Sequence, residues 1–397
     1  MLHLSRRRFL ALSTAALAGS RKTLAVEDEL IVHPAKVLAE FERSRVLRAA
    51  RHYLGEVPKT IVAVAAPNSA GGLHDYYSDA DYFWPDPKNP NGPYINRDGE
   101  SNPANFNAHR ELMIRLSIQV AALAAAWTVT KKREFADHGT AHLRAWFITA
   151  ATRMNPNLQY AQAVHGLSTG RSWGIIDTLH LAEVAQAATV LHRDGVLSAN
   201  DWQGIHEWFG EYLSWLQTSE PGQKERDAKN NHGSCWIVQA AAFARLTGDT
   251  AVAQTCRQRL KSVEFPTQIA HDGSFPLELA RTKPYGYALF NLDALGMAAQ
   301  ILSVPSDNLW TYRLPDGREL RACFDFMKPF VVDKAKWPYA HDVQYFDDLP
   351  VRQPSFLFAG FAYRDDGYLN LWRRLDPDPT VAEVIRNHPF RQPLLWI

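Results

Sequence analysis

Apolar residues recur at intervals of three and four along most of this chain, which is the spacing of one face of an α-helix. Ala-rich stretches at 121–126 and 240–244 would let such helices pack closely. Strand-like alternation is scarce, and residues 60–65 are the best expected strand. The pattern predicts helices at 37–54, 106–127, 135–154, 175–191, 200–216, 236–246, 252–263 and 289–302.

These helices follow one another in pairs joined by short links, of which Gly248-Asp249 is the clearest, and Asn200 is an expected helix N-cap. The pattern predicts an all-α fold, either an (α/α) toroid (an incomplete barrel of helix hairpins) or a helical array. No linker divides the chain, so we expect a single domain over residues 26–397. Long loops in a compact domain usually carry function, so we expect them to form a substrate cleft. The Pro-, Gly- and Asn-rich loops are 67–103, 155–173, 217–229, 265–287 and 337–353.

Composition narrows the class of protein. The 397 residues carry a formal net charge of +1, which gives no electrostatic case for binding nucleic acid or an anionic membrane surface. The cysteines are three, Cys235, Cys256 and Cys323, so an intramolecular disulfide scaffold is not expected. No Cys/His cluster has zinc spacing, and we expect neither a metal nor a cofactor.

The N-terminus has the pattern of an export signal. Arg6-Arg7 precede an apolar run that ends near Ala18 and is too short to span a bilayer as a mature helix. This predicts a twin-arginine signal peptide over residues 1–25, with cleavage after Ala18 or after Ala25. We therefore expect a periplasmic or secreted protein without membrane insertion after the signal is removed.

Two segments combine side chains that suit acid–base chemistry on an anion. Asn231-His232 precede the helix expected at 236–246, where the helix dipole favours negative charge, although this pair alone is typical of a helix cap. Arg281 can clamp a carboxylate, and Tyr285 or Tyr287 can transfer a proton if positive charge lowers its pKa. Together these groups suit holding a carboxylate while the neighbouring carbon loses its proton.

Two loops are candidates for substrate contact. The segment 74–87 is rich in aromatic side chains and either stacks on sugar rings or packs on the helices. The segment 155–177 either brings Arg171 and Trp173 to a charged sugar or is a rigid connector held by Asp177. The aromatic candidates in the first loop are Tyr76, Tyr77, Tyr82 and Trp84.

Taken in order, these four segments resemble the alginate lyase superfamily, most closely the glucuronan and alginate lyases of polysaccharide lyase family 38. The resemblance covers roughly residues 54–302 and implies an α/α toroid and metal-independent β-elimination on an anionic uronic-acid polysaccharide. It implies that Asn231, His232 and Arg281 neutralise the substrate carboxylate. It also implies that Tyr287, with Tyr285 as the alternative, is both base and acid, and that Tyr285 otherwise contacts substrate.

Two other classes of protein compete with this interpretation. A glycoside hydrolase on a similar toroid needs two carboxylates beside the bond that it breaks, and the candidates are Asp177, Glu183, Asp272 and Glu278. A non-catalytic periplasmic polysaccharide-binding protein would use the aromatic loop alone. The sequence does not choose among mannuronate, guluronate and glucuronate, and it does not indicate an oligomeric state.

Overall fold

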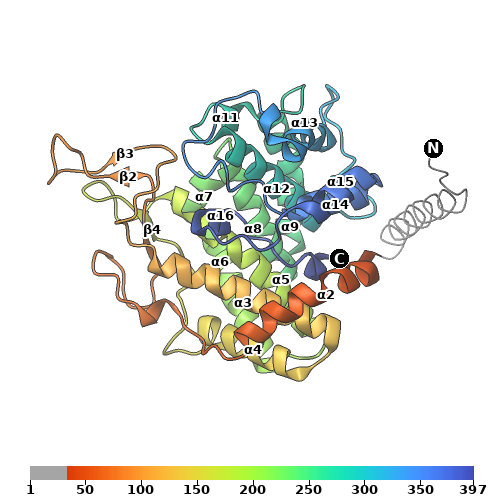
Figure 1. The fold of residues 1–397 in the computed structure, drawn as a ribbon. Coiled ribbons are helices and arrows are strands. Elements are labelled where there is room, and N and C mark those ends of the chain that lie inside the picture. Colours follow the sequence, from red (N-terminus) through yellow and green to blue (C-terminus); the bar gives the residue numbers. More distant parts are fainter. Residues whose placement is uncertain (1–33) are drawn as a thin grey trace, which may run out of the picture.

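The computed structural model describes residues 34–397, so the expected signal peptide lies outside the described residues. Helices dominate this part of the chain, as predicted (Figure 1). They are α2 (Pro34–Tyr53), α3 (Ala108–Thr130), α4 (Arg133–Phe147), α5 (Leu181–Arg193), α6 (Ala199–Thr218), α7 (Glu220–Arg226), α8 (Asn231–Thr247), α9 (Thr250–Arg259), α10 (Phe265–Gln268), α11 (Pro276–Leu279), α12 (Pro284–Leu302), α13 (Leu320–Val332), α14 (Pro354–Tyr363), α15 (Asp366–Arg374) and α16 (Ala382–Arg386).

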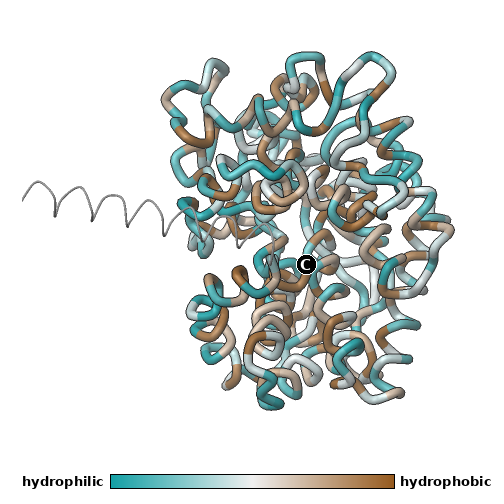
Figure 2. Tube along the Cα trace, turned by 90° about the vertical axis from the view of Figure 1, so that its right-hand side faces the viewer, coloured by the Kyte–Doolittle hydropathy of each residue, from teal (hydrophilic) through white to brown (hydrophobic). Residues whose placement is uncertain are grey.

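The helices form two layers of an all-α toroid, which confirms the predicted fold class. In the inner layer α3, α5, α8, α12 and α14 each pack against the next. These helices are buried on most faces, whereas outer helices such as α4 and α15 have one apolar side. In Figure 2 hydrophobic residues recur along the helical coils and hydrophilic residues gather in the outer loops.

Helix α3 is long and apolar enough to cross a membrane by length and composition alone. However, 72% of its most apolar window is buried inside the fold, and it packs against α2, α4 and α5. The apolar composition of α3 therefore reflects its buried position in the middle of a helical layer.

Several helix ends differ from the sequence expectations. Residues 60–65 contain a short 3-10 helix, so the expected strand is wrong. Residues 148–154 lie beyond α4, and residues 172–180 form a 3-10 helix ahead of α5. Ser198, rather than Asn200, caps α6 by accepting a hydrogen bond from the Asp201 amide. The Gly248-Asp249 link is confirmed, because Gly248 ends α8 in the left-handed conformation and Asp249 caps α9.

Four short strands lie in the loops at one end of the toroid (Figure 1). Strand β1 (Tyr77–Asp79) pairs in parallel with β4 (Tyr160–Ala163). Strand β2 (Phe83–Trp84) pairs antiparallel with β3 (Ile95–Asn96). The β1–β4 pair joins two of the predicted functional loops and contacts α3 and the 3-10 helix Ser172–His180, and the stranded loops form one wall of the site described next.

Candidate active site

A polar cleft of about 410 Å³ lies between the stranded loops and the first turns of α8 and α12. Asn231, His232, Arg281 and Tyr287 all line it, although they come from two segments that are about 50 residues apart in the chain. Of the predicted substrate-binding residues, Tyr82, Arg171 and Trp173 also line it. The structure therefore brings together the four residues proposed for catalysis and three of the seven proposed for binding.

The helix N-terminus at α8 explains how Asn231 and His232 reach the cleft. The side chain of Asn230 caps α8 by accepting a hydrogen bond from the His232 amide, so the helix begins five residues earlier than expected. Asn231 Nδ2 donates to Glu278 Oε2 at 2.7 Å, and its backbone N–H donates to Glu278 Oε1 at 2.7 Å. The Glu278 carboxylate thus fixes Asn231 in place, and burial raises the pKa of this carboxylate.

The His232 ring is held on two sides. Its Nδ1 lies 2.6 Å from Oε1 of Glu225, a residue of α7 that is 1% exposed. The Trp173 ring meets the imidazole edge-on, with ring centroids 4.5 Å apart. Because a carboxylate accepts from Nδ1–H, Nε2 is the nitrogen that is left for a ligand in the cleft. Helix α7 lies inside the segment 217–229, which the sequence had suggested as a loop.

Arg281 is paired with a carboxylate of the protein itself. Its Nε and Nη2 donate to the two carboxylate oxygens of Asp98, at 3.0 and 2.6 Å. Asp98 also accepts a hydrogen bond from the hydroxyl of Thr282 at 2.9 Å. Burial raises the pKa of Asp98, but the hydrogen bonds from Arg281 and Thr282 outweigh it and lower that pKa below its usual value. Asp98 is therefore a carboxylate that fixes the direction of the guanidinium.

The turn that carries Asp98 requires a glycine. Gly99 has a φ of +78°, and a Cβ atom there would lie 2.4 Å from Oγ1 of Thr282. Any larger residue at position 99 would be strained and would push the turn away from Thr282. The close approach of these two segments is what lets Asp98 reach Arg281.

Tyr287 sits in the first turn of α12 with its hydroxyl toward the cleft wall. Its hydroxyl donates to the hydroxyl of Tyr82 at 3.1 Å, and the Arg281 guanidinium carbon lies 4.4 Å from the centroid of its ring. Burial raises the pKa of Tyr287, and the positive charge of Arg281 opposes part of that rise. The net shift is upward, so Tyr287 carries its proton at neutral pH.

Tyr285 is a core residue. It is 0% exposed, and its hydroxyl donates to the carbonyl of Phe330 at 3.1 Å. Its ring packs edge-on against Trp337 and Phe346. Both the predicted substrate contact and the alternative catalytic assignment of Tyr285 are therefore wrong in this structure, because one helical turn places residues 285 and 287 on different faces of α12.

Three aromatic residues of the first loop also lie away from the cleft. Tyr76 is 1% exposed and donates its hydroxyl to Asp177, and Tyr77 is 3% exposed and donates to Asp79. Trp84 donates its indole N–H to the carbonyl of Glu100, which secures the β2–β3 loop. None of the three lines the cleft, whereas Phe83 does. Tyr76 is too deeply buried to stack on a sugar, and the substrate contacts of Tyr77 and Trp84 stay predictions.

Arg171 and Arg386 give the cleft its remaining positive charge. Arg171 donates to the carbonyl and side-chain oxygens of Gln162, each at 3.0 Å, and lies 4.7 Å from the ring centroid of Phe83. Arg386, from the last turn of α16, pairs with Asp81 at 2.6 Å. The lining thus holds three arginines against two aspartates, which favours an anionic ligand.

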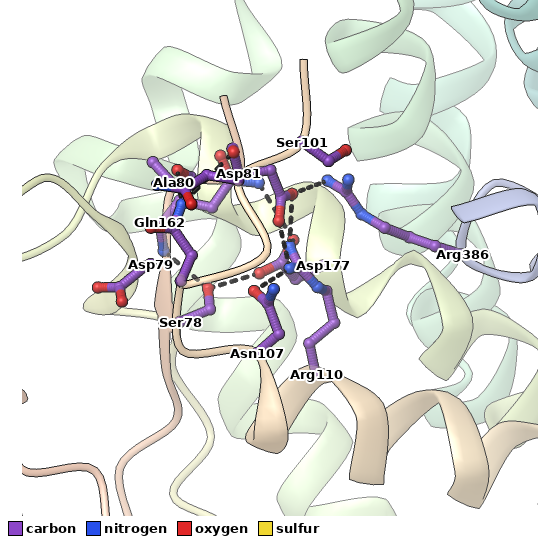
Figure 3. Close-up of polar contacts among 12 residues, drawn as sticks. Ser78, Asp79, Ala80, Asp81, Ser101, Asn107, Arg110, Gln162, Asp177 and Arg386 are labelled. Atoms are coloured by element: carbon purple, nitrogen blue, oxygen red, sulfur yellow. Dashed lines mark hydrogen bonds and ion pairs between the residues drawn. The ribbon is translucent and has the colours of Figure 1, made fainter. Parts of the chain in front are cut away.

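A buried ionic network forms the floor of the cleft (Figure 3). Arg110 binds Asp81 through both of its terminal nitrogens, with one of these bonds at 2.7 Å, and lies 3.4 Å from Asp177. Asp177 also accepts hydrogen bonds from the hydroxyls of Tyr76 and Ser78 and from Nε2 of Gln162, at 3.0, 2.7 and 3.1 Å. This network joins the aromatic loop, α3 and the 3-10 helix 172–180 beneath the cleft.

The sequence analysis missed the contributions of Asp98, Glu225 and Arg386. Asp98 stands in a loop that the sequence marked as functional, but nothing in the sequence paired it with Arg281. Glu225 lies seven residues before His232 but on a separate helix, α7, which was obscured by the polar composition around it. Arg386 lies in the region where the resemblance to known families was weakest.

The carboxylates proposed for a hydrolase are not arranged around this cleft. Asp177, Glu183 and Glu278 are all buried and bound to protein donors, and Asp272 lies in an exposed turn. The two acids that do line the cleft, Asp81 and Asp98, both have pKa values below the usual one and pair with arginines. Neither is suited to be the general acid of a glycosidase.

Comparisons with known proteins agree with this architecture. The family profile described as "Alginate lyase" matches residues 62–337, so the fold and cleft belong to a polysaccharide lyase. This chain is a member of the alginate lyase family. No curated protein matches the chain significantly.

Solved structures extend the likeness over nearly the whole chain. The crystal structure of an alginate lyase from Bacteroides ovatus aligns with a TM-score of 0.78 and 29% identity, covering 95% of this chain and 97% of that one. Alginate lyase A1-III from Sphingomonas species A1 shares the fold, with a TM-score of 0.58, 19% identity, and coverage of 91% and 94%. A variant of A1-III complexed with a tetrasaccharide aligns with a TM-score of 0.56 and 16% identity, covering 87% and 88%. The narrower likeness to polysaccharide lyase family 38 stays a prediction.

Proposed function

We propose that this lyase cleaves a uronic-acid polysaccharide, either alginate rich in mannuronate or glucuronan, by β-elimination. The observation that carries the proposal is the convergence of Asn231, His232, Arg281 and Tyr287 on one cleft. Two further arginines in the same lining suit a polyanion. The similar structures that are alginate lyases, one of them holding a tetrasaccharide, support the choice of substrate class.

The first requirement of the reaction is to make the C5 proton more acidic. That proton lies next to a carboxylate, which resists a second negative charge. In our proposal Asn231 donates a hydrogen bond to this carboxylate, and His232 does so through Nε2–H as the imidazolium, since Nδ1–H is engaged by Glu225. Nearby Arg281 stabilises the enolate-like intermediate electrostatically. No step in this scheme uses a metal ion or a cofactor, because side chains supply the charge neutralisation.

The second requirement is a base and an acid. Tyr287, as a phenolate, accepts the proton from C5, and the electrons of that C–H bond form the C4–C5 double bond. The C4–O4 bond breaks, and the Tyr287 hydroxyl then gives the proton to O4 of the leaving chain. One residue can serve both roles when the proton and the leaving group lie on the same face, as in mannuronate and glucuronate.

Guluronate presents its C5 proton on the opposite face of the ring. For that sugar His232 is the better base in our proposal, through Nε2, because Nδ1 is engaged by Glu225. Tyr287 would then be the acid alone. The balance of activity between poly-mannuronate and poly-guluronate therefore reports which of the two side chains removes the proton.

The reaction is tested by incubating the protein with poly-mannuronate, poly-guluronate and glucuronan in parallel. Elimination creates a conjugated enoate, whose ultraviolet absorbance rises with time. New reducing ends without that absorbance would indicate hydrolysis, and binding without either signal would indicate a carbohydrate-binding protein. Either of these results on all three polymers would overturn the proposal.

We further propose that the chain is exported by the twin-arginine route to the periplasm or the exterior. The support is the Arg6-Arg7 pair with the apolar segment that follows it. Changing both residues to Lys should leave the protein in the cytoplasm with its N-terminal segment attached. Normal export of that double variant, read by fractionation and mass, would contradict the proposal.

A further inference from the structure

A second hollow adjoins the cleft on the far side of Trp173. Its volume is about 450 Å³, and it shares Trp173 and Asn230 with the lining of the cleft. Trp173 is 44% exposed, and Leu277, also in the lining, is 41% exposed. A ligand chain that passes Trp173 would therefore leave the cleft and enter this second hollow.

The charged groups around this hollow favour an anion. Lys229 is exposed in the lining and has no ion-pair or hydrogen-bond partner within residues 34–397. Lys224 lines the hollow too, paired 2.6 Å from Glu220 in a contact that is open to solvent. The acid in the lining, Glu225, is 1% exposed and occupied by His232. The charge that faces the solvent here is thus positive.

The hollow that adjoins the cleft at Phe83 differs in chemistry. Phe83 separates the cleft from a hollow of about 790 Å³ whose lining includes Tyr94, His165 and Asp79 and contains no lysine or arginine. Of these two neighbouring hollows within residues 34–397, only the one past Trp173 is lined by lysines. A polymer with a carboxylate on every sugar gains more from that direction than from the other.

We propose that the hollow beside Trp173 is an additional subsite for a uronic-acid residue of the polysaccharide. Lys229 attracts the carboxylate of that sugar, while Trp173 and Leu277 contact the apolar face of its ring. This inference rests on the proposed function, because it assumes that the cleft binds a uronan. Its consequence is that substrates long enough to reach this hollow bind better than those confined to the cleft.

The test compares uronic-acid oligosaccharides of two to six sugars as substrates for the wild type, Lys229→Met and Leu277→Glu. The wild type should gain in kcat/KM at the chain length that first fills the hollow. Lys229→Met should reduce that gain roughly two- to five-fold, which is the range for one exposed charge pair. Leu277→Glu should reduce it further, since it adds a repelling carboxylate, and added salt should shrink both effects.

Lys132→Met is the matched control. Lys132 is an exposed lysine that follows the far end of α3, about 30 Å along the helix from the end beside the cleft floor. Its substitution removes the same charge and should leave the chain-length dependence unchanged. An equal gain with length in Lys229→Met, Leu277→Glu and the wild type would overturn the subsite.

Electrophoresis through a native gel that contains alginate measures binding of the polymer by how far the protein is retarded, without a measurement of turnover. Lys229→Met and Leu277→Glu should be retarded less than Lys132→Met, which matches Lys229→Met in charge. Equal retardation of the two Lys→Met variants would contradict the subsite while leaving the lyase reaction intact. A wild type that yields no unsaturated product from any uronan would contradict the proposed function instead, so the two failures are distinguishable.

Discussion

Arg281 donates two hydrogen bonds to Asp98, at 3.0 and 2.6 Å, and the same guanidinium lies 4.4 Å from the ring centroid of Tyr287. A free arginine would be available to clamp a substrate carboxylate with both of its parallel N–H groups. Here those groups are engaged by a protein carboxylate. Arg281 is therefore placed to act on the substrate and on Tyr287 mainly through its charge and its remaining N–H donors.

This pairing makes Asp98 a positioning residue. Asp98→Ala should release the guanidinium from the Tyr287 ring and lower kcat on the order of ten-fold, by analogy with other misplaced catalytic groups. Asp98→Asn keeps an oxygen acceptor and should recover part of the loss. Steady-state kinetics for both variants, with thermal unfolding as the check on stability, would measure this. Wild-type kcat in Asp98→Ala would show that Arg281 needs no anchor.

Tyr287→Phe tests the proton transfers directly. The change removes one hydroxyl and keeps the ring under Arg281, so packing should barely alter. If Tyr287 is base and acid, turnover of poly-mannuronate or glucuronan should fall at least about 10²- to 10⁴-fold, the usual worth of one general acid–base step. Binding of the polymer, measured by calorimetry, should persist.

Tyr285→Phe is the matched control for that substitution. It deletes the hydrogen bond to Phe330 and should cost about 1 kcal/mol of stability, with turnover retained. A dead Tyr285→Phe beside an active Tyr287→Phe would reverse the assignment. Full activity in both variants would mean that no tyrosine of α12 carries the proton.

The pH dependence follows from the electrostatics of Tyr287. Burial raises its pKa and Arg281 opposes that rise, so the phenolate that acts as base is scarce at neutral pH. For the unliganded enzyme, kcat/KM should therefore increase with pH on the alkaline side, because deprotonation produces the active form.

Removing the charge of Arg281 should shift this pH dependence of kcat/KM. In Arg281→Met the positive charge that lowers the pKa of Tyr287 is lost, so the alkaline rise in kcat/KM should move to higher pH. The maximum should also fall on the order of 10²-fold, as when a transition-state donor is removed. A pH–rate profile of the variant that superimposes on the wild type in position would contradict the coupling between Arg281 and Tyr287.

Helical periodicity predicted the toroid because inner and outer helices bury apolar stripes that are visible locally. The periodicity predicted helix starts less well, because capping residues determine where a helix begins. Asn230 caps α8 ahead of the apolar run, and α12 starts at Pro284. As a result His232 and Tyr287 lie in first helical turns, at the ends that face the cleft. The helices after residue 303 were not predicted. Each is too short to show the apolar spacing over four or five turns.

The composition of the aromatic loop indicated a function for the loop but not which rings face the cleft. Tyr76 and Tyr77 turn inward to Asp177 and Asp79, whereas Tyr82 and Phe83 line the cleft. That choice depends on pairings across the fold. Arg386 is the clearest case of a site residue that the sequence could not predict. It lines the cleft and forms an ion pair with Asp81, a residue that lies more than 300 positions earlier in the chain.

The ionic floor of the cleft should be a major source of stability. Arg110→Met would leave the buried carboxylates of Asp81 and Asp177 without their central cation, and breaking a buried pair in this way typically costs about 3–5 kcal/mol. Urea unfolding of this variant should show that loss. Arg133→Met, which breaks an exposed pair with Asp137, should cost less than about 1 kcal/mol.

The same network sets the response to acid. Burial raises the pKa of Asp81, but Arg110 and Arg386 outweigh burial and bring that pKa below the usual value. A carboxylate with a lowered folded-state pKa contributes stability that is complete above its unfolded value, about 3.9, and is lost as the pH falls through the folded value. The wild type should therefore lose stability below about pH 4, and Asp81→Asn should be less stable at pH 7 and lose less on acidification. An equal acid response in both proteins would show that Asp81 does not contribute to it.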